Sequence, residues 1–443
     1  MIARPRSPGW LPLLGGLCVL LPGAAWADEA AGAGHGAAVA PVLLALAVIL
    51  AVAKLGGDLA VRVGQPAVLG ELAGGVLAGN LGLVGVHGLD HVRDDAAVDL
   101  LSRIGVIVLL FEVGLESTIA QMLKVGLSSL LVATLGVAAP FALGWGVGAW
   151  LLPAAGPYVH AFLGATLTAT SVGITARVRQ DLGTSQTTEA RIVLGAAVID
   201  DVMGLVILAV VSGVIAAAAG GGEMSGGAIA WTVAKAVGFL GGSLWLGTLV
   251  SRPLFRVASM LRARGVLLAL GLAFCFVLSW LASRIGLAPI VGAFAAGLIL
   301  EDVHYRDFRD RGEHGLEELV APISSFLVPV FFVLMGMRTD LRTFTEPGVG
   351  LLALGLIVAA IAGKQICGFG VLGKGIDRLS VGIGMIPRGE VGLIFANIGV
   401  ALTIDGEPIV TRATFSAVVV MVIVTTVVTP PALKWSLGRA RGS

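Results

Sequence analysis

Charged residues are scarce in this chain. Asp, Glu, Lys and Arg make up 13% of its 443 residues, whereas hydrophobic residues make up 57%. A soluble protein needs about a quarter of its residues charged, so lipid must cover much of this surface. The net charge of +1 gives no electrostatic support for nucleic-acid binding. Cys18, Cys275 and Cys367 lie in apolar runs without a CxxC or Cys/His cluster, which argues against a disulfide framework or a zinc site.

The first 27 residues have the pattern of a signal peptide. Arg4 and Arg6 supply a basic start, residues 11–21 an apolar middle, and residues 25–27 a small-x-small cleavage site. The alternative is an additional transmembrane helix, but three prolines bracket a run that is too short to span a bilayer. We therefore expect residues 1–27 to act as a signal peptide and residues 28–40 to form an external N-terminal segment.

Thirteen further segments are apolar enough to cross a membrane. A crossing needs about 20 apolar residues, fewer where protein shields the helix. The segments centre on residues 41–62, 66–84, 98–116, 122–152, 159–180, 189–218, 228–250, 264–282, 287–301, 317–337, 348–372, 379–402 and 411–435. They predict an all-α polytopic membrane protein with a membrane domain at 41–435 and a short cytoplasmic tail at 436–443.

The distribution of loop charges supports this count. An external N-terminus and thirteen crossings place the C-terminus in the cytoplasm, and cytoplasmic loops attract Lys and Arg. The predicted outer loops are acidic or nearly neutral, with Arg338 and Arg342 as exceptions. The predicted inner loops hold Arg177, Arg179, Arg191, Arg252, Arg256, Arg262, Arg264, Arg306, Arg309, Arg311, Lys374, Arg378, Arg439 and Arg441.

Short sequence matches indicate an internal repeat. Residues 70–77 in the second segment match residues 292–299 in the ninth, and each stretch follows a proline. Residues 114–119, ending the third segment, match residues 336–341, ending the tenth. Equivalent segments are seven apart, and because seven is odd, the halves cross the membrane in opposite directions. The pattern predicts two inverted six-helix repeats, typical of secondary transporters. They occupy residues 41–218 and 264–435, with a linker helix at 228–250.

Equivalent positions in the two repeats also contain helix-disrupting sequences. Residues 166–175 are rich in Thr and Ser, and residues 382–392 contain Gly, Pro, Arg and Glu. Non-helical backbone at membrane depth is tolerated only where it is buried in protein or lines a cavity. The alternative is close helix packing by small residues. We expect crossed discontinuous helices, the arrangement that forms transporter ion sites.

Two adjacent carboxylates lie in the middle of the sixth segment. Asp200 and Asp201 are flanked by apolar residues on both sides. A carboxylate at membrane depth is costly and usually faces a cavity and has a function. In a helix the two side chains point ~100° apart, so they need not share a partner.

Several other polar residues lie within the apolar segments. Lys364, in the eleventh segment, is a natural counter-ion, and the alternative is a purely structural salt bridge. Arg388 and Glu390 lie near the break in the twelfth segment, where they neutralise helix dipole ends and hold the crossing together; the alternative is direct ion coordination. Thr170 and Ser171 either donate hydroxyl oxygens to a dehydrated sodium ion or cap the broken helix.

A further group of titratable residues has weaker functional signals. Glu71, Glu112 and Glu116 are secondary acids: Glu112 is deep enough to line an inner funnel, and Glu116 lies at a cytoplasmic helix end in solvent. His304 and His314 lie in a charged inner loop, as pH sensors or simply as solvated histidines.

In these motifs the chain resembles the second family of bacterial monovalent cation:proton antiporters, which includes sodium/proton exchangers and the Kef potassium efflux systems. The resemblance covers residues 41–435. Its most specific marks are residues 168–171, residues 199–201, Lys364 and residues 387–392. It implies the antiporter fold, with a dimerisation panel and a mobile core.

The resemblance implies a division of labour between the two aspartates. Asp201 is the principal carboxylate for sodium and protons, and Asp200 pairs with Lys364 while contributing to the Na⁺ site. Paired acids resemble electrogenic exchangers that move two protons per sodium, whereas Kef-type members usually replace the first aspartate by an uncharged residue.

The resemblance also implies roles around the crossing and an oligomeric state. Thr170 and Ser171 line the crossover, Glu390 supports it, and the protein is a homodimer. Because the chain ends at Ser443, we expect no Kef-type regulatory domain.

These observations predict a secondary active antiporter, not an enzyme, that exchanges cytoplasmic Na⁺ for external protons in the bacterial inner membrane. It needs no cofactor, and its surroundings are the lipid bilayer. The alternatives are a K⁺/H⁺ antiporter or Kef-like efflux protein, a channel-like pathway, and a non-transporting ion sensor. An intramembrane aspartyl protease is disfavoured, because its two acids lie on different helices, one in a Gly-x-Gly-Asp motif that is not found here.

Overall fold

The computed structural model describes most of the membrane domain. The described residues are 36–87, 89–116, 126–171, 175, 179, 184, 187–219, 226–261, 263–300, 308, 314–373, 375–388, 390–404 and 407–442. The predicted signal peptide lies outside them, as do His304 and the predicted inner-loop residues Arg177, Arg262, Arg306, Arg309, Arg311 and Lys374.

The described elements are helical apart from one short hairpin. The first half contains α2 (Gly36–Arg62), α3 (Ala67–Gly79), η2 (Leu81–Val84), η3 (Asp90–Asp94), α4 (Ala96–Glu116), α6 (Leu127–Leu151), η4 (Pro153–Ala155), α7 (Gly156–Thr168) and α9 (Thr188–Ala219). The second contains α10 (Gly226–Ser259), α11 (Val266–Arg284), α12 (Pro289–Ile299), α14 (Leu316–Met337), η6 (Leu341–Thr345), α15 (Val349–Ile366), η7 (Cys367–Gly370), α16 (Arg378–Gly384), α17 (Glu390–Ala401), β1 (Thr403–Ile404), β2 (Glu407–Pro408) and α18 (Arg412–Gly442). The strands β1 and β2 pair antiparallel, with Thr403 opposite Pro408.

Each of the thirteen predicted crossings corresponds to a helix or to a broken helix, which confirms a polytopic all-α membrane protein. Among the described residues, seven helices are both long and apolar enough to span a membrane, and three apolar helices are shorter. The short helices α3 and α12 have 13 and 11 residues, or about 20 Å and 17 Å at ~1.5 Å per residue. Most residues of both helices are buried, and packing against protein allows such short helices at membrane depth.

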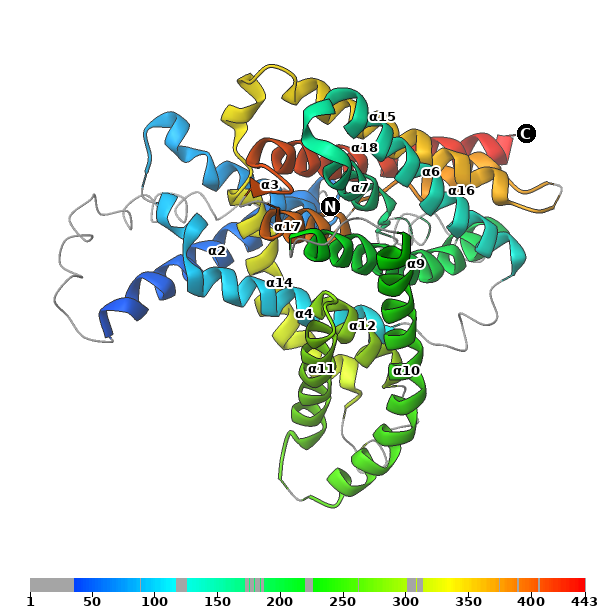
Figure 1. Cartoon of the computed structure of the whole chain (residues 1–443). Coiled ribbons are helices and arrows are strands. Elements are labelled where there is room, and N and C mark those ends of the chain that lie inside the picture. Colours follow the sequence, from blue (N-terminus) through cyan, green and yellow to red (C-terminus); the bar gives the residue numbers. More distant parts are fainter. Residues whose placement is uncertain are drawn as a thin grey trace, which may run out of the picture.

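The helices form two groups, and each group contains helices from both predicted repeats. The panel consists of α2, α3, α4, α11, α12 and α14, and the core domain consists of α6, α7, α9, α15, α16, α17 and α18. Each group therefore combines three predicted segments from each half, and α10 contacts both α9 and α12. Figure 1 shows α6, α15 and α18 across the top, with α4, α11 and α12 below them.

The panel is held together by glycine contacts that occur twice. A Cβ atom at Gly75 of α3 would lie 2.3 Å from the Val333 carbonyl oxygen of α14, and one at Gly297 of α12 would lie 2.2 Å from the Phe111 carbonyl oxygen of α4. Gly75 and Gly297 are 222 residues apart, as are Phe111 and Val333. Each contact joins one half of the chain to the other, and the repeat relates the two contacts to each other, as a two-fold internal repeat requires.

A third glycine contact lies where the two halves meet. A Cβ atom at Gly105 of α4 would lie 2.6 Å from the carbonyl oxygen of Leu327 in α14. These two residues are also 222 positions apart, so the contact joins a residue to its own repeat equivalent. Helices α4 and α14 therefore cross at the two-fold axis of the repeat.

Candidate functional site

A buried ion pair links the two halves of the core domain. Asp200 lies in the middle of α9 and is 1% exposed, and Lys364 of α15 is 0% exposed. The Lys364 Nζ donates a hydrogen bond to Asp200 Oδ1 over 3.0 Å. The structure thus brings together the two residues that the sequence predicts as partners. A charge pair at this depth is stable only with close geometry, because both ions are removed from water.

Small neighbours make room for the lysine side chain. A Cβ atom at Gly136 of α6 would lie 3.4 Å from the Lys364 Nζ, so a larger residue there would crowd the ammonium group. Helix α6 therefore allows α15 to bring its lysine up to Asp200 in α9.

The second aspartate has a different environment. Asp201 follows Asp200 in α9 and is half-buried, whereas Asp200 is fully buried. Successive residues of a helix point ~100° apart, so only one carboxylate can face Lys364 directly. The two acids therefore differ in their access to solvent, as competition between an ion and protons at one of them requires.

Two unwound segments cross beside these acids. Helix α7 ends at Thr168, and the segment between α16 and α17 begins after Gly384. The Ser171 N–H donates to the Pro387 carbonyl over 2.8 Å, and the Thr175 hydroxyl donates to the Gly384 carbonyl over 2.7 Å. The predicted crossed discontinuous helices are therefore present, and the Ser171–Pro387 bond joins the two repeats where each lacks helical structure.

Arg388 ties three elements together at the crossing. Its side chain is 0% exposed, and Nη1 donates to the Ala169 carbonyl over 2.6 Å while Nη2 donates to the Ala360 carbonyl over 3.3 Å. In turn, the Thr426 hydroxyl of α18 donates to the Arg388 carbonyl over 3.0 Å. The geometry favours the structural role among those predicted for Arg388. Glu390 begins α17, and its side chain lies outside the described atoms.

Buried oxygen atoms without hydrogen-bond partners lie at the site. Within the described residues, neither Asp200 Oδ2 nor Thr170 Oγ1 has a partner, although both atoms are shielded from solvent. Leaving a buried polar atom unpaired costs about 1–3 kcal/mol. Both atoms are oxygens, the ligand type that hard cations prefer.

The secondary acids Glu71 and Glu112, and His314, lie away from the Asp200–Lys364 pair. Glu112 of α4 is half-buried and accepts a hydrogen bond from the Ser324 hydroxyl of α14, so it belongs to the panel. Glu71 is buried in α3 of the panel. His314 is exposed and lies 2.6 Å from Glu318, as a solvated loop histidine would. The Glu116 side chain lies outside the described atoms.

The two outer-loop arginines that depart from the charge rule differ in their partners. Arg338, at the end of α14, makes an ion pair with Asp99 of α4 at 2.6 Å. Its Nη1 also donates to the Asn397 side chain of α17 over 3.3 Å, which links the panel to the core domain. An acid of the panel therefore compensates this arginine. Arg342 has no such partner among the described residues.

A polar network between the start of α16 and helix α18 was not predicted from the sequence. Asp377 accepts hydrogen bonds from the hydroxyls of Ser380, over 2.7 Å, and Ser436, over 3.3 Å. Burial raises the pKa of Asp377, but these bonds and the Leu379 N–H together hold that pKa below its ordinary value. Arg179 was expected in an inner loop, yet it is buried and donates to the Ser380 carbonyl over 3.4 Å. Asp377 also caps α16 by accepting the Leu379 N–H, and an aspartate at a helix start does not by itself indicate such a network.

Comparison with known proteins agrees with this geometry. A family model described as the transmembrane region of sodium/hydrogen exchangers matches residues 45–437. The chain is 38% identical to the high-affinity Na⁺/H⁺ antiporter NhaS3 of Synechocystis, over 89% of this chain and 90% of that protein. It is 35% identical to the Na⁺/H⁺-K⁺ antiporter GerN of Bacillus cereus, over 89% of this chain and 95% of the relative.

A solved structure shows the same fold. The sodium proton antiporter MjNhaP1 of Methanocaldococcus jannaschii superposes with a TM-score of 0.64 at 17% identity, covering 89% of this chain and 98% of that one. The family match spans nearly the whole described membrane domain, including the acids of α9, the lysine of α15 and both unwound segments. The chain therefore belongs to the sodium/hydrogen exchanger family, as the sequence resemblance predicted.

Proposed function

We propose that this protein is a secondary active antiporter that exchanges cytoplasmic Na⁺ for external protons at Asp201. One observation carries the proposal: a half-buried aspartate adjoins a fully buried Asp200–Lys364 pair beside two crossed unwound segments. The names of the relatives, antiporters of Na⁺ and H⁺, agree with it.

The proposed cycle is competition for one carboxylate. Ionised Asp201 binds Na⁺ from the cytoplasm, and movement of the core domain against the panel carries the site to the outer face. Protons then displace Na⁺ and return with the core domain. Binding of either ion neutralises the carboxylate, which lowers the cost of moving it through the membrane.

The residues around Asp201 have supporting roles in this proposal. Asp200 Oδ2 and the Thr170 hydroxyl supply oxygen atoms to the dehydrated ion, and Ser171 fixes the unwound backbone near it. Lys364 balances the charge of Asp200, so that one net negative charge remains for the transported ion. Arg388, with Glu390, holds the crossing in place.

The paired acids favour electrogenic exchange. One proton on Asp201 exchanging for one Na⁺ moves no net charge. If the Asp200–Lys364 pair opens and carries a second proton inward, one net charge moves per cycle, which is worth about 2.3 kcal/mol per 100 mV. The membrane potential then contributes to Na⁺ extrusion together with the proton gradient.

The proposal also covers the location, the orientation and the oligomeric state of the protein. We place it in the bacterial inner membrane as a homodimer, with the N-terminus outside and the C-terminus in the cytoplasm, because the loop charges favour this orientation. The cargo consists of monovalent cations and protons, and no resident cofactor is required.

Potassium is the alternative cargo. The relative GerN is named as an antiporter of both Na⁺ and K⁺, so the same site chemistry accepts either ion in some members. A K⁺/H⁺ exchange reaction would use the same residues with a wider cavity.

Transport in everted vesicles tests the site assignment. We expect Asp201→Asn to abolish Na⁺-dependent proton movement while leaving the melting temperature of the purified protein within a few degrees of wild type. Asp58→Asn is the matched control, since among the described residues Asp58 forms an ion pair only with Arg62, on an exposed face of α2. Exchange at the wild-type rate in Asp201→Asn would exclude Asp201 as the carrier. Liposomes with clamped voltage, assayed with Na⁺ and K⁺ in turn, identify the cargo and its charge balance.

A further inference from the structure

A polar pocket lies at the end of the panel, away from the aspartates. It has a volume of about 140 Å³ and lies between the end of α3, the loop before α4, and the turn from α14 into η6. Its lining residues are Gly79, Asn80, Gly82, Leu83, His87, Arg93, Asp340 and Arg342. The loop charges place it on the outer side of the membrane.

The walls of the pocket are fixed by one side chain. Asn80 Nδ2 donates to the Thr339 carbonyl over 2.7 Å, and Asn80 Oδ1 accepts from the Leu341 N–H over 2.9 Å. These two bonds join the end of α3 to the turn that follows α14. The pocket therefore has a preformed shape.

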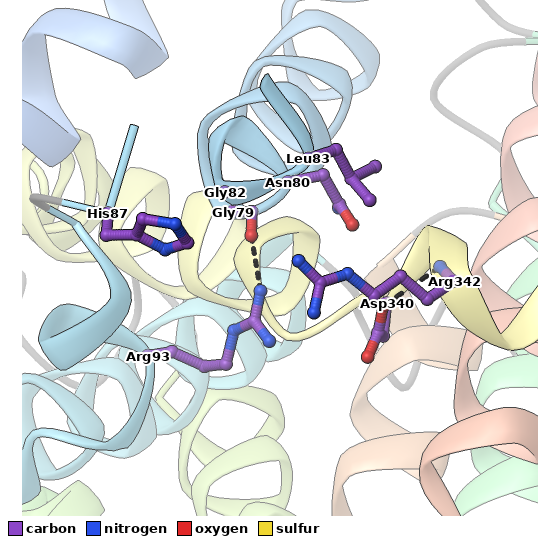
Figure 2. Close-up of a pocket in the computed structure, with 8 residues that line it drawn as sticks. All are labelled: Gly79, Asn80, Gly82, Leu83, His87, Arg93, Asp340 and Arg342. Atoms are coloured by element: carbon purple, nitrogen blue, oxygen red, sulfur yellow. Dashed lines mark hydrogen bonds between the residues drawn. The ribbon is translucent and has the colours of Figure 1, made fainter. Parts of the chain in front are cut away.

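Two guanidinium groups enter this pocket from opposite walls. Arg93 comes from the loop before α4 and Arg342 from η6, and Figure 2 shows their planar ends converging between the Gly79 carbonyl and the Asp340 carboxylate. The imidazole of His87 lines a third side.

The arginines have few partners of opposite charge. Arg93 Nη2 donates to the Gly79 carbonyl, and its Nε is buried without a hydrogen-bond partner. Neither Arg93 nor Arg342 makes a salt bridge within the described residues. The one acid of the pocket, Asp340, already accepts the Arg342 backbone N–H over 2.9 Å as the cap of η6.

One Asp340 carboxylate cannot balance two guanidinium groups, so the pocket keeps an excess of positive charge, and the unpaired buried Nε of Arg93 adds a further cost. An anion between the two guanidinium groups removes both penalties. Guanidinium groups match the oxygens of phosphate in pairs, with two parallel N–H···O bonds each. We propose that this pocket binds a phosphate-type oxyanion, supplied either as free phosphate or as the phosphate of a lipid headgroup.

The chain offers a clean variant for testing this site. The backbone of Arg342 makes the local bonds, to Asp340 and to the Thr345 hydroxyl, so Arg342→Gln keeps them. Its side chain is exposed, which makes misfolding of the variant improbable on structural grounds. Arg412→Gln is the matched control, because Arg412 is also exposed on the predicted outer side but does not line the pocket.

The experiment measures the melting temperature of the purified full-length protein in a non-ionic detergent. Sodium phosphate is titrated against sodium chloride at equal Na⁺ and ionic strength, and short-chain phosphatidylglycerol is titrated separately. A ligand that binds the folded state raises the melting temperature in a saturable way. We expect Arg342→Gln to raise the half-saturating concentration by about tenfold or more, the effect of losing a charged hydrogen-bond pair, and Arg412→Gln to leave it unchanged.

The two titrations separate the possible sources. Saturation by phosphate assigns the site to the free ion, and saturation by phosphatidylglycerol alone assigns it to a lipid headgroup. If neither ligand exceeds chloride, or if Arg342→Gln binds as tightly as wild type, the pocket is not an oxyanion site.

Discussion

The Ser171 N–H donates to the Pro387 carbonyl over 2.8 Å, and this bond joins the unwound segment of one repeat to that of the other. Each segment thereby satisfies a backbone group that its own interrupted helix leaves without a partner. The Arg388 side chain reinforces the junction through the carbonyls of Ala169 and Ala360. The ion site is therefore held by bonds between the repeats rather than by either repeat alone.

Arg388→Gln should destabilise this junction. The shorter side chain cannot reach both carbonyls, and each buried carbonyl without a donor costs about 1–3 kcal/mol. We expect a clear fall in the melting temperature and a loss of exchange. Thr426→Val serves as the comparison, because it removes only the 3.0 Å bond to the Arg388 carbonyl and should cost about 1 kcal/mol. Equal melting temperatures for Arg388→Gln and wild type would show that the junction does not depend on the guanidinium group.

Lys364→Ala should lower stability strongly. It leaves the Asp200 carboxylate buried without its cation, and breaking a buried pair in this way typically costs about 3–5 kcal/mol. Thermal unfolding in detergent measures the loss. Adding Asp200→Asn to Lys364→Ala should recover much of it, because the uncompensated charge disappears. Simple additivity of the two single changes would contradict direct coupling between these residues.

The paired glycine contacts of the panel should respond alike to substitution. Gly75→Ala and Gly297→Ala each place a Cβ atom within 2.3 Å or less of a backbone oxygen, and the helices must separate to accept it. Overpacking of this kind typically costs about 1–3 kcal/mol. Gly146→Ala is the control: a Cβ atom at Gly146 of α6 has no neighbour within 4 Å, so this change should be neutral or stabilise the helix by up to about 1 kcal/mol. A loss of stability at only one of the two panel positions would count against equivalent roles.

Asp377 should make stability depend on pH in the acid range. Its pKa in the folded protein lies below the ordinary value of 3.8, so its stabilising contribution is fully present above about pH 4 and is lost as the pH falls through the folded pKa. We expect Asp377→Asn to melt at a lower temperature than wild type by the same amount at pH 7 and pH 5. The difference should shrink below pH 4 as the wild-type carboxyl protonates. A difference that stays constant down to pH 3 would mean that the carboxylate charge is not the source of the stabilisation.

Much of the fold could be predicted, because a run of about 20 apolar residues is the sequence signal of a membrane-spanning helix. The helix breaks in α7 and between α16 and α17 were predictable for a related reason: Thr, Ser, Gly and Pro are conspicuous within apolar runs. The role of Lys364 as a counter-ion followed from charge, since few ionised groups lie at that depth and an unpaired one is costly, whereas its pairing with Asp200 was implied by the family resemblance.

Contacts between distant segments were harder to predict. The sequence placed Arg388 near the crossing but gave no sign that it reaches Ala169 in the other repeat, because that bond depends on how closely the helices approach. Arg179 was expected in an inner loop from its charge alone, yet it is buried against Ser380. The pocket between Arg93 and Arg342 depends on a tertiary arrangement of two loops, which no local pattern encodes.

The glycine contacts between α3 and α14, and between α12 and α4, have a mechanical consequence. Where a backbone rests directly on another backbone, no side chain can change rotamer to absorb a displacement. In the proposed cycle, the panel therefore resists shear while the core domain shifts against it. Amide hydrogens of α3, α4, α12 and α14 should accordingly exchange with solvent more slowly than those flanking the breaks in α7 and α16.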